Sequence, residues 1–388
     1  METKRPCSSR YDSFCPVDGQ YQYNTEVVFD MNGCLVARYH KQNLVKGEEQ
    51  KMFDVTKDIE HSYFDTDFGR FGLIICYDAF FKSPAIELVE RYNVTDIIFS
   101  TAWTNVNLHY TSVAYHSGWA RMMNVNFLSA NINYRPARLT GSGVYCPNGI
   151  INYTFEADSS AGKLLVTQVP VRRNLDKYCS TSPKTPVQFI TPSITDNSTI
   201  FSDWKNKITL FDMFKLKYLN GLSGTISACM KNVCCEAKFN RSVTEEDYAL
   251  GVFDGMHRYT GTYYLEICIL VRCIAGRCGG QVRPIISNTV FHYYELTATM
   301  PTKYVIPEVI TPDVSFPTDW NYYNGRQKRI QGTNKKLFLV ALMGRNFDKD
   351  PFSGGRIVHD SVELDTSGKD FITPSIIILF YTLLISVI

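Results

Sequence analysis

The sequence has no long apolar run, no excess of charge of either sign and no internal repeat. The apolar run at the C-terminus, Ile376 to Ile388, has thirteen residues without a charge, which is short of the roughly 20 that a membrane-spanning helix needs. The 40 basic residues face 38 acidic ones, and no block of Lys and Arg stands apart, so nucleic-acid binding is disfavoured. The most basic stretch, residues 325–336, is predicted to be a solvated loop.

The N-terminal end of the chain lacks a secretion signal that the C-terminal end requires. The first nineteen residues, METKRPCSSRYDSFCPVDG, contain no apolar segment or cleavage site of a secretory signal peptide. At the other end, the apolar tail follows the small residues Asp365, Thr366, Ser367 and Gly368, which is the order of a glycosylphosphatidylinositol attachment signal. Such a signal requires the secretory pathway, so we expect the chain to lack its N-terminal part. A membrane-spanning tail and a buried core segment are the alternatives.

Cysteine is abundant, with twelve residues in the chain. Six of them lie close together: Cys229, Cys234, Cys235, Cys268, Cys273 and Cys278. This density predicts disulfides and an oxidising compartment, whereas the spacing does not give the paired CxxC knuckles of a zinc site. Cys146 is left open as paired or free. Sequons for N-glycosylation, which agree with a secreted protein, begin at Asn93, Asn152, Asn197 and Asn240.

The length of 388 residues predicts two domains. Residues 1–185 alternate strand and helix patterns, which is typical of an α/β domain. Strands are predicted at 25–30 and 34–39 around an Asn-Gly turn, and at 71–76, 97–100, 126–132, 141–144 and 164–169. Helices are predicted directly after residue 76 and at 112–124.

The second half has a different texture. Residues 186–200 belong to a segment rich in Ser, Thr and Pro and are predicted to be a linker. Residues 201–360 are predicted to form a cysteine-braced β domain, because β-branched and aromatic runs occupy 262–273, 288–300 and 336–344. Residues 361–388 form the predicted attachment signal.

Cys76 is the first candidate for chemistry. It ends the apolar run FGLIIC and precedes a helical pattern, so its sulfur is expected to project from a sharp turn beside a helix N-terminus. That place favours a reactive thiolate. On its own, a cysteine there is more typical of an inert packing residue.

The surrounding residues change this interpretation. The stretches YQYNTEVVFDMNGCLVARYHKQNL, FGRFGLIICYDAFFKSPAIELV, FSTAWTNVNLHYTSVAYHSGWARMMNVNFLSANINY and LTGSGVYCPNG closely resemble the vanins, which are pantetheinases, and less closely biotinidase, within the nitrilase family. YALGVFDGMHRYTGTYYLEICILVRC extends the resemblance into the second half. It implies an α-β-β-α sandwich, incomplete at its N-terminus, followed by a smaller cysteine-rich β domain of the vanin type.

The resemblance assigns roles to particular residues. Cys76 in GLIICYDAFF matches the family's nucleophile, and Lys41 in YHKQNL matches its lysine, whose ammonium stabilises an oxyanion. Glu48 resembles a second glutamate that supports or orients this lysine. Trp103, Asn105 and His116 fall in segments that lie near the ligand in this fold and are candidate substrate contacts.

The family's general-base glutamate lies in a Pro-Glu motif upstream of the hairpin and has no counterpart here. Only Glu2 and Glu26 precede Lys41, neither in that motif, and Pro307-Glu308 lies in the wrong order. The same missing segment would carry the signal peptide.

The function implied is hydrolysis of a linear amide, pantetheine to pantothenate and cysteamine, through a thioester on Cys76. Biotin-amide hydrolysis and a catalytically impaired surface protein are the alternatives. No cofactor, metal, nucleic acid or obligate protein partner is implied. The partners are a small amide and, through the lipid anchor, the outer face of the cell membrane.

Overall fold

The structure is a computed structural model that describes most of the chain. The described residues are 2–45, 48, 53–105, 110–156, 162–171, 212–243, 245–258, 261–274, 277–278, 287–312 and 315–351. The predicted linker at 186–200, the sequon at Asn197 and the predicted lipidation residues Asp365, Ser367 and Gly368 lie outside these ranges. Among the described helices, none is long and apolar enough to cross a membrane.

Three antiparallel strands form the first sheet, in the order β1 (Glu2–Pro6), β2 (Gln20–Phe29) and β3 (Leu35–His40). The predicted Asn-Gly turn joins β2 to β3. Gly33 has φ +81°, a conformation that glycine adopts without strain. The Asp30 carboxylate accepts hydrogen bonds from the backbone N–H groups of Asn32 and Cys34, at 2.9 and 2.8 Å. A disulfide between Cys7 and Cys15 closes the loop between β1 and β2.

A second sheet of six strands forms the centre of the first domain. Its order is β4 (Tyr63–Thr66), β5 (Gly69–Ile75), β6 (Asp96–Thr101), β7 (Asn126–Asn131), β8 (Ser142–Cys146) and β9 (Gly149–Thr154). The central strands β5, β6 and β7 run parallel, which agrees with the apolar runs at 71–75 and 97–99. Strands predicted at 71–76, 97–100, 126–132 and 141–144 are confirmed.

The strand predicted at 164–169 is wrong. Residues 162–171 pair with no neighbouring strand in the described part of the chain. Leu164 and Val166 are 84% and 79% exposed, so these apolar side chains are not buried against a sheet.

Helices cover one side of this sheet. The segment after β5 is divided into a 3-10 helix, η1 (Cys76–Phe80), a π-helical turn, η2 (Lys82–Ile86), and a short α-helix, α2 (Glu87–Glu90). The long helix α3 (Ser112–Met123) ends at Asn124, which has φ +56°. A further 3-10 turn, η4, covers Arg135–Ala137.

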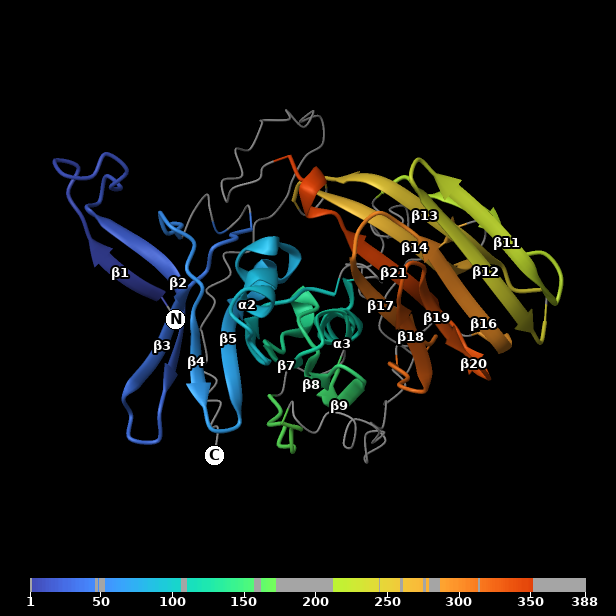
Figure 1. Ribbon diagram of the computed structural model, residues 1–388, viewed down its shortest axis with the longest axis horizontal. Coiled ribbons are helices and arrows are strands. Elements are labelled where there is room, and N and C mark those ends of the chain that lie inside the picture. The colour runs from blue at the N-terminus through green and yellow to red at the C-terminus, as the bar shows by residue number, and fades with distance from the viewer. Residues whose placement is uncertain are drawn as a thin grey trace.

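The two faces of the central sheet are buried by different partners. One face, with Leu73, Ile75 and Ile98, packs against Ala37 and Tyr39 of the first sheet. The opposite face packs against α3 and the second domain. The layers therefore follow one another as sheet, sheet, helices and second domain, as Figure 1 shows from left to right.

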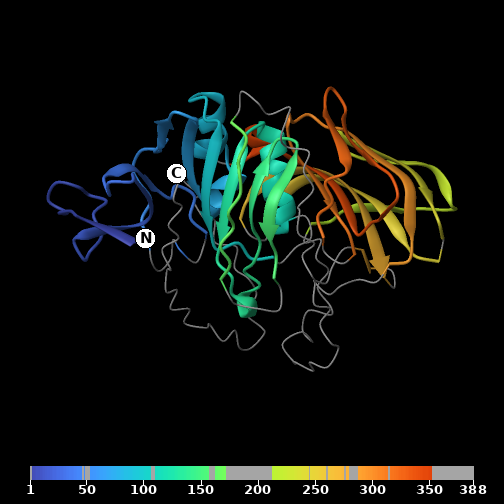
Figure 2. The same cartoon turned by 90° about the horizontal axis from the view of Figure 1, so that it is seen from below.

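Two six-stranded antiparallel sheets form the second domain, which confirms the predicted cysteine-rich β domain. The first sheet contains β10 (Lys215–Tyr218), β13 (Tyr248–His257), β14 (Tyr263–Ile274), β21 (Leu339–Arg345) and β17 (Tyr304–Ile310), with β15 (Arg277–Cys278) beside β14. The second contains β11 (Ser223–Met230), β12 (Val233–Arg241), β16 (Val290–Thr299), β19 (Lys328–Gly332) and β18 (Trp320–Asn324), with β20 (Lys335–Lys336) beside β16. A 3-10 turn, η8 (Phe347–Lys349), follows β21. The sheets pack face to face in Figures 1 and 2.

Disulfides brace this sandwich. The clustered cysteines pair as Cys229–Cys234, Cys235–Cys268 and Cys273–Cys278, which confirms disulfides over a zinc site for these six residues. Cys235 lies on β12 and Cys268 on β14, so their bond joins the two sheets. Cys146 is also disulfide-bonded. Cys34 and Cys76 are the free cysteines of the described residues.

The basic segment at 325–336 is not the predicted loop. It contains β19, which pairs with both β16 and β18. Ile330 is fully buried, and Arg329 lies over the ring of Tyr323 at 4.2 Å from its centroid. Alternation places Arg329 on the outer face, whereas Lys328 is 6% exposed on the same face as Ile330. The number of basic residues alone therefore did not reveal the strand.

Candidate active site

The backbone presents Cys76 at the carboxyl edge of the central sheet. Cys76 follows directly after β5, and its neighbour Ile75 is paired with Ser100 near the end of β6. The cysteine has φ +49°, a left-handed conformation that is uncommon for a residue other than glycine. Such strain persists only where surrounding contacts hold it, and it gathers at functional sites. Cys76 is a partly exposed residue and carries no disulfide.

Lys41 lies directly after β3 and is almost fully buried. Its side chain is 2% exposed, and its ammonium donates a short hydrogen bond to the carboxylate of Glu48. Burial alone lowers the pKa of Lys41, but the negative charges of Cys76, Glu48 and Asp78 outweigh it, so the pKa rises above the usual 10.5. Lys41 therefore carries its charge at neutral pH, within electrostatic reach of the Cys76 sulfur.

Glu48 is fixed by more than the lysine. Its carboxylate also accepts hydrogen bonds from the Asn24 side-chain amide and the Val45 backbone N–H, each at 3.0 Å. These contacts hold the carboxylate against the ammonium of Lys41. The structure thus brings together the three predicted catalytic residues Cys76, Lys41 and Glu48.

Asp78 holds the turn that carries the nucleophile. One carboxylate oxygen accepts from the Tyr39 hydroxyl at 2.8 Å and the Ile75 N–H at 3.0 Å. The other accepts from the backbone and side-chain amides of Asn43, at 2.8 and 2.9 Å. Burial raises the pKa of Asp78 above its usual value despite the opposing effects of Lys41 and these hydrogen bonds. The sequence interpretation missed this residue, although its place two residues after the cysteine was a signal.

The predicted helix dipole beside Cys76 is small. The element that begins at Cys76 is a five-residue 3-10 turn rather than a long helix, and a macrodipole grows with the number of aligned peptide units. The positive charge beside the thiol therefore comes from Lys41.

Glu26 extends from β2 into the space between the two sheets. It accepts a hydrogen bond from the Ser100 hydroxyl at 2.5 Å, while its second oxygen is buried without a hydrogen-bond partner among the described residues. Burial raises the pKa of Glu26 to about 8, and the nearby charge of Asp78 adds to this effect. The site thus contains a carboxyl group that holds its proton at neutral pH.

Two of the predicted substrate contacts, Trp103 and Asn105, are buried and bonded to other parts of the protein. Trp103 stacks on Phe80 at a centroid distance of 5.1 Å and donates its indole N–H to the Tyr110 carbonyl. Asn105 bonds the carbonyls of Arg138 and Thr140 and accepts from the N–H of Ser112. The side chains are 5% and 3% exposed, respectively. Their contact with a substrate stays a prediction.

His116 is enclosed in the core. It is 0% exposed, packs against Phe99 and Phe127, and bonds the Ser129 hydroxyl at 3.0 Å. Burial lowers the pKa of His116 to about 3, so the ring is neutral. In this structure no part of the ring is accessible to a ligand, and its role as a substrate contact stays a prediction.

These groups define a class of protein. A strained, accessible cysteine lies within electrostatic reach of a buried ammonium, on an α/β sandwich with parallel central strands. The thiolate supplies a nucleophile and the ammonium stabilises charge that develops on a carbonyl oxygen. The arrangement is that of an enzyme that uses a cysteine nucleophile on a carbonyl group.

Comparison with known proteins agrees with this class. Residues 8–124 match the carbon-nitrogen hydrolase family, and residues 201–350 match the vanin C-terminal domain. The chain is 38% identical to a pantetheinase of Sus scrofa, over 98% of this chain and 72% of that protein. It is 40% identical to a pantetheinase of Homo sapiens, over 89% and 67%, and 31% identical to a biotinidase of Bos taurus, over 90% and 71%.

The chain therefore belongs to the carbon-nitrogen hydrolase family, in the group formed by the pantetheinases and biotinidase. This confirms the resemblance predicted from the motifs around Lys41 and Cys76.

Proposed function

We propose that this chain hydrolyses the linear amide of pantetheine to pantothenate and cysteamine, with Cys76 as the nucleophile. The observation that carries the proposal is the buried Lys41–Glu48 pair beside the strained Cys76 turn. The similarity to pantetheinases over nearly the whole chain supports this choice of amide.

In the proposed reaction, the Cys76 sulfur forms a bond to the amide carbonyl carbon, and an electron pair moves onto the oxygen. The Lys41 ammonium stabilises this oxyanion. Collapse of the intermediate breaks the carbon-nitrogen bond, and cysteamine leaves with the proton that the thiol gave up. A pantothenoyl thioester remains on Cys76. Water then adds to the thioester carbonyl, pantothenate is released and the thiol regains its proton.

Glu48 acts through Lys41 in this scheme. Its carboxylate keeps a buried ammonium charged and in place, because an unpaired buried cation loses its proton more readily. Without Glu48, Lys41 would offer the oxyanion a weaker and less ordered partner.

The test is turnover of a fluorogenic pantothenate amide by the wild-type chain and two cysteine variants. Cys76→Ala is expected to lower kcat/KM by more than about a thousandfold, because no other group forms the thioester. Cys34→Ser, which changes the other free cysteine of the described residues, is the matched control and should keep wild-type turnover. Turnover that survives in Cys76→Ala would rule out this nucleophile.

A biotinyl amide serves as the second substrate in the same assay. Faster turnover of this compound than of the pantothenate amide would replace pantetheine by a biotin amide, while Cys76 would keep its role. Absence of turnover with both amides would contradict the proposed activity of the chain.

We also propose that the protein is extracellular and held at the cell surface by a glycosylphosphatidylinositol anchor, attached in the region of Asp365, Ser367 and Gly368. The disulfides support an oxidising compartment. Glycosylation is proposed at Asn197 and at Asn93, Asn152 and Asn240; Asn93 and Asn240 are exposed. Phosphatidylinositol-specific phospholipase should release the protein from expressing cells, and retention on the membrane would contradict the anchor.

A further inference from the structure

A buried arginine of the second domain contacts the turn that carries Cys76. Arg345, the last residue of β21, is 1% exposed. Its Nε donates a hydrogen bond of 2.8 Å to the carbonyl oxygen of Phe80, the last residue of the η1 turn that begins at Cys76. A side chain from the β sandwich thus binds the backbone of the nucleophile turn directly.

The remaining contacts of Arg345 fix its position. The guanidinium forms a bidentate pair with the Asp350 carboxylate, with N–O distances of 3.1 and 2.7 Å. It also lies over the rings of Tyr263 and Phe347, at 4.7 and 4.8 Å from their centroids. Burying a guanidinium costs free energy unless it is paired, and here the pairing leaves Nε directed at Phe80.

Tyr263 of β14 reinforces the same contact. Its ring stacks on the Phe80 ring at a centroid distance of 5.5 Å and meets the edge of Tyr77 at 6.5 Å. At Gly261 a Cβ atom would lie 1.7 Å from the Tyr77 hydroxyl. This spacing leaves no room for a side chain at Gly261, so the second domain lies tightly against the residue next to Cys76.

The turn is held from three directions. The loop after β3 and the β3 strand bind the Asp78 carboxylate through Asn43 and Tyr39. The helix α3 binds the Ala79 carbonyl through Tyr115 and Trp119, each at 3.2 Å. Arg345 binds the next carbonyl, that of Phe80. The left-handed conformation of Cys76 depends on contacts such as these.

We propose that Arg345 is a positioning residue for the nucleophile, through which the β domain keeps the Cys76 thiol aligned with Lys41. The proposal rests on the proposed role of Cys76 as the nucleophile. Without the guanidinium, the buried Phe80 carbonyl loses its partner, and the turn can relax toward an unstrained conformation. Displacement of a reacting group by about 1 Å can lower a rate by about a hundredfold.

The test compares Arg345→Met and Arg345→Lys with Arg241→Met. Arg241 is the matched control because it is also a buried arginine of the β domain, 3% exposed, that bonds backbone carbonyls, those of Gly221 and Glu246. Two readouts are measured on folded protein: the pH profile of Cys76 alkylation by iodoacetamide in a Cys34→Ser background, and kcat and KM for the pantothenate amide. Alkylation needs no substrate, so this readout separates failure of the present proposal from failure of the proposed amide.

Arg345→Met is expected to shift the alkylation profile and to lower kcat by about 10- to 100-fold with KM changed less than threefold. Arg345→Lys should recover part of this loss, because an ammonium can still donate to the Phe80 carbonyl. Arg241→Met should leave both readouts at the wild-type level. Equal loss in Arg241→Met and Arg345→Met, or a wild-type profile in a folded Arg345→Met, would overturn the proposal. If Arg345→Met does not fold, the same criteria apply to Asp350→Asn, which loosens Arg345 without removing it.

Discussion

Lys41 combines burial with a positive charge, and Glu48 makes that combination stable. The ammonium is 2% exposed and the carboxylate 19% exposed, so water screens their attraction less than it would at the surface. An ammonium held in this way needs little reorganisation when charge develops on a nearby oxygen.

The pair leads to a prediction about Glu48→Gln. The amide keeps a hydrogen bond to Lys41 but removes the negative charge that raises the pKa of Lys41. We expect kcat to fall about 10- to 100-fold and the alkaline limb of the kcat profile to move to lower pH. Steady-state rates between pH 6 and 10 measure both effects. Glu60→Gln is the control, because that carboxylate bonds His40 rather than Lys41; an equal loss in both variants would contradict the role of Glu48.

Glu26 gives a prediction about stability and pH. Its folded pKa of about 8 lies above the usual 4.5, so the folded state binds more protons than the unfolded state between these values. The stability from this group is fully present below pH 4.5 and is lost as pH rises through 8. Glu26→Gln keeps a neutral side chain at every pH and should be more stable than wild type by a few kcal/mol near pH 9.

Urea unfolding of this variant at pH 5, 7 and 9 measures the effect. The exposed Asp67→Asn should follow the wild-type dependence on pH. If Glu26→Gln also followed it, the Glu26 carboxyl would be ionised in the folded protein at neutral pH.

At the residue scale, sequence reasoning located the groups that lie in long motifs and missed those that meet only in the fold. Lys41 and Cys76 fall within two stretches of similar sequence, and Glu48 follows the first stretch by four residues, so their proximity was predictable. Arg345 lies 265 positions from Phe80, and no pattern in either segment indicates the bond between them. His116 lies in a motif that predicted a contact with the substrate, but in the fold its ring is enclosed by aromatic rings.

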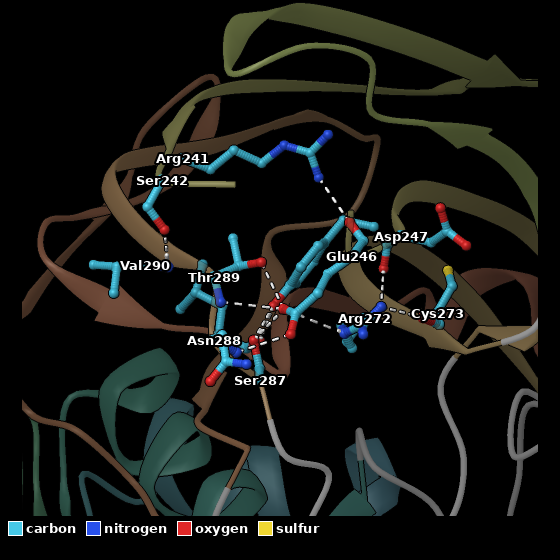
Figure 3. Close-up of polar contacts among 12 residues, drawn as sticks. Arg241, Ser242, Glu246, Asp247, Arg272, Cys273, Ser287, Asn288, Thr289 and Val290 are labelled. Carbon is cyan, nitrogen blue, oxygen red and sulfur yellow. Dashed lines mark hydrogen bonds and ion pairs between the residues drawn. The ribbon is translucent and has the colours of Figure 1, made fainter. Parts of the chain in front are cut away.

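At the element scale, the loop between β12 and β13 is held by one carboxylate. Glu246 accepts hydrogen bonds from the Ser287 hydroxyl at 2.6 Å, the Asn288 N–H at 2.8 Å and both the N–H and the hydroxyl of Thr289. Figure 3 shows these donors converging on the carboxylate from the segment that leads into β16. Burial alone would raise the pKa of Glu246, but the hydrogen bonds lower it to about 2.

These hydrogen bonds to the Glu246 carboxylate lead to a prediction about Glu246→Gln. Hydrogen bonds to a charged acceptor stabilise by about 1.5–3 kcal/mol, and we expect a loss of that size in the free energy of unfolding at pH 7. The folded pKa lies below the usual 4.5, so this contribution is fully present above pH 4.5 and is lost as pH falls toward 2. The difference between variant and wild type should therefore shrink in acid.

Chemical unfolding at pH 7 and pH 3 measures this difference. Glu245→Gln, at the exposed neighbouring residue, should stay within about 0.5 kcal/mol of wild type. If the difference in unfolding free energy between Glu246→Gln and wild type does not change with pH, the stabilisation does not depend on the charge of Glu246.

Elements were predictable where the hydrophobic pattern matched a buried face. The parallel strands β5 and β6 contain the apolar runs FGLII and IIF between two layers, and these runs indicate burial on both faces. The segment at 164–169 also begins with apolar residues but pairs with no strand among the described residues. In contrast, β19 pairs on both sides although it contains the basic residues Lys328 and Arg329. The local sequence pattern indicates whether a segment favours a strand, whereas the pairing of that strand depends on residues distant in the sequence.

At the scale of the whole molecule, the two domains share a hydrophobic core. The cluster that contains Val113, Tyr115 and Trp119 of α3 continues into Ile306 and Ile310 of β17 without interruption. Lys303 and Tyr304 add contacts to Glu90 of α2 at the rim. We therefore expect the domains to unfold in one cooperative transition.

Gly118 tests this expectation because α3 touches β17 there. A Cβ atom at Gly118 would lie 2.5 Å from a methyl group of Ile306 and 2.6 Å from the Pro307 carbonyl oxygen. The backbone oxygen cannot rotate away, so Gly118→Ala must push α3 from β17. Overpacking of this kind typically costs about 1–3 kcal/mol, and we expect a lower melting temperature with a transition that broadens or separates into two.

Differential scanning calorimetry distinguishes these outcomes. Gly224→Ala in β11 is the matched control, because the added methyl group would meet the Phe239 ring at 3.6 Å, an ordinary contact distance. It should leave a single transition near the wild-type temperature. If Gly118→Ala behaved in the same way, the shared core would not couple the domains. Arg345 would then hold the Cys76 turn across an interface that contributes little to global stability.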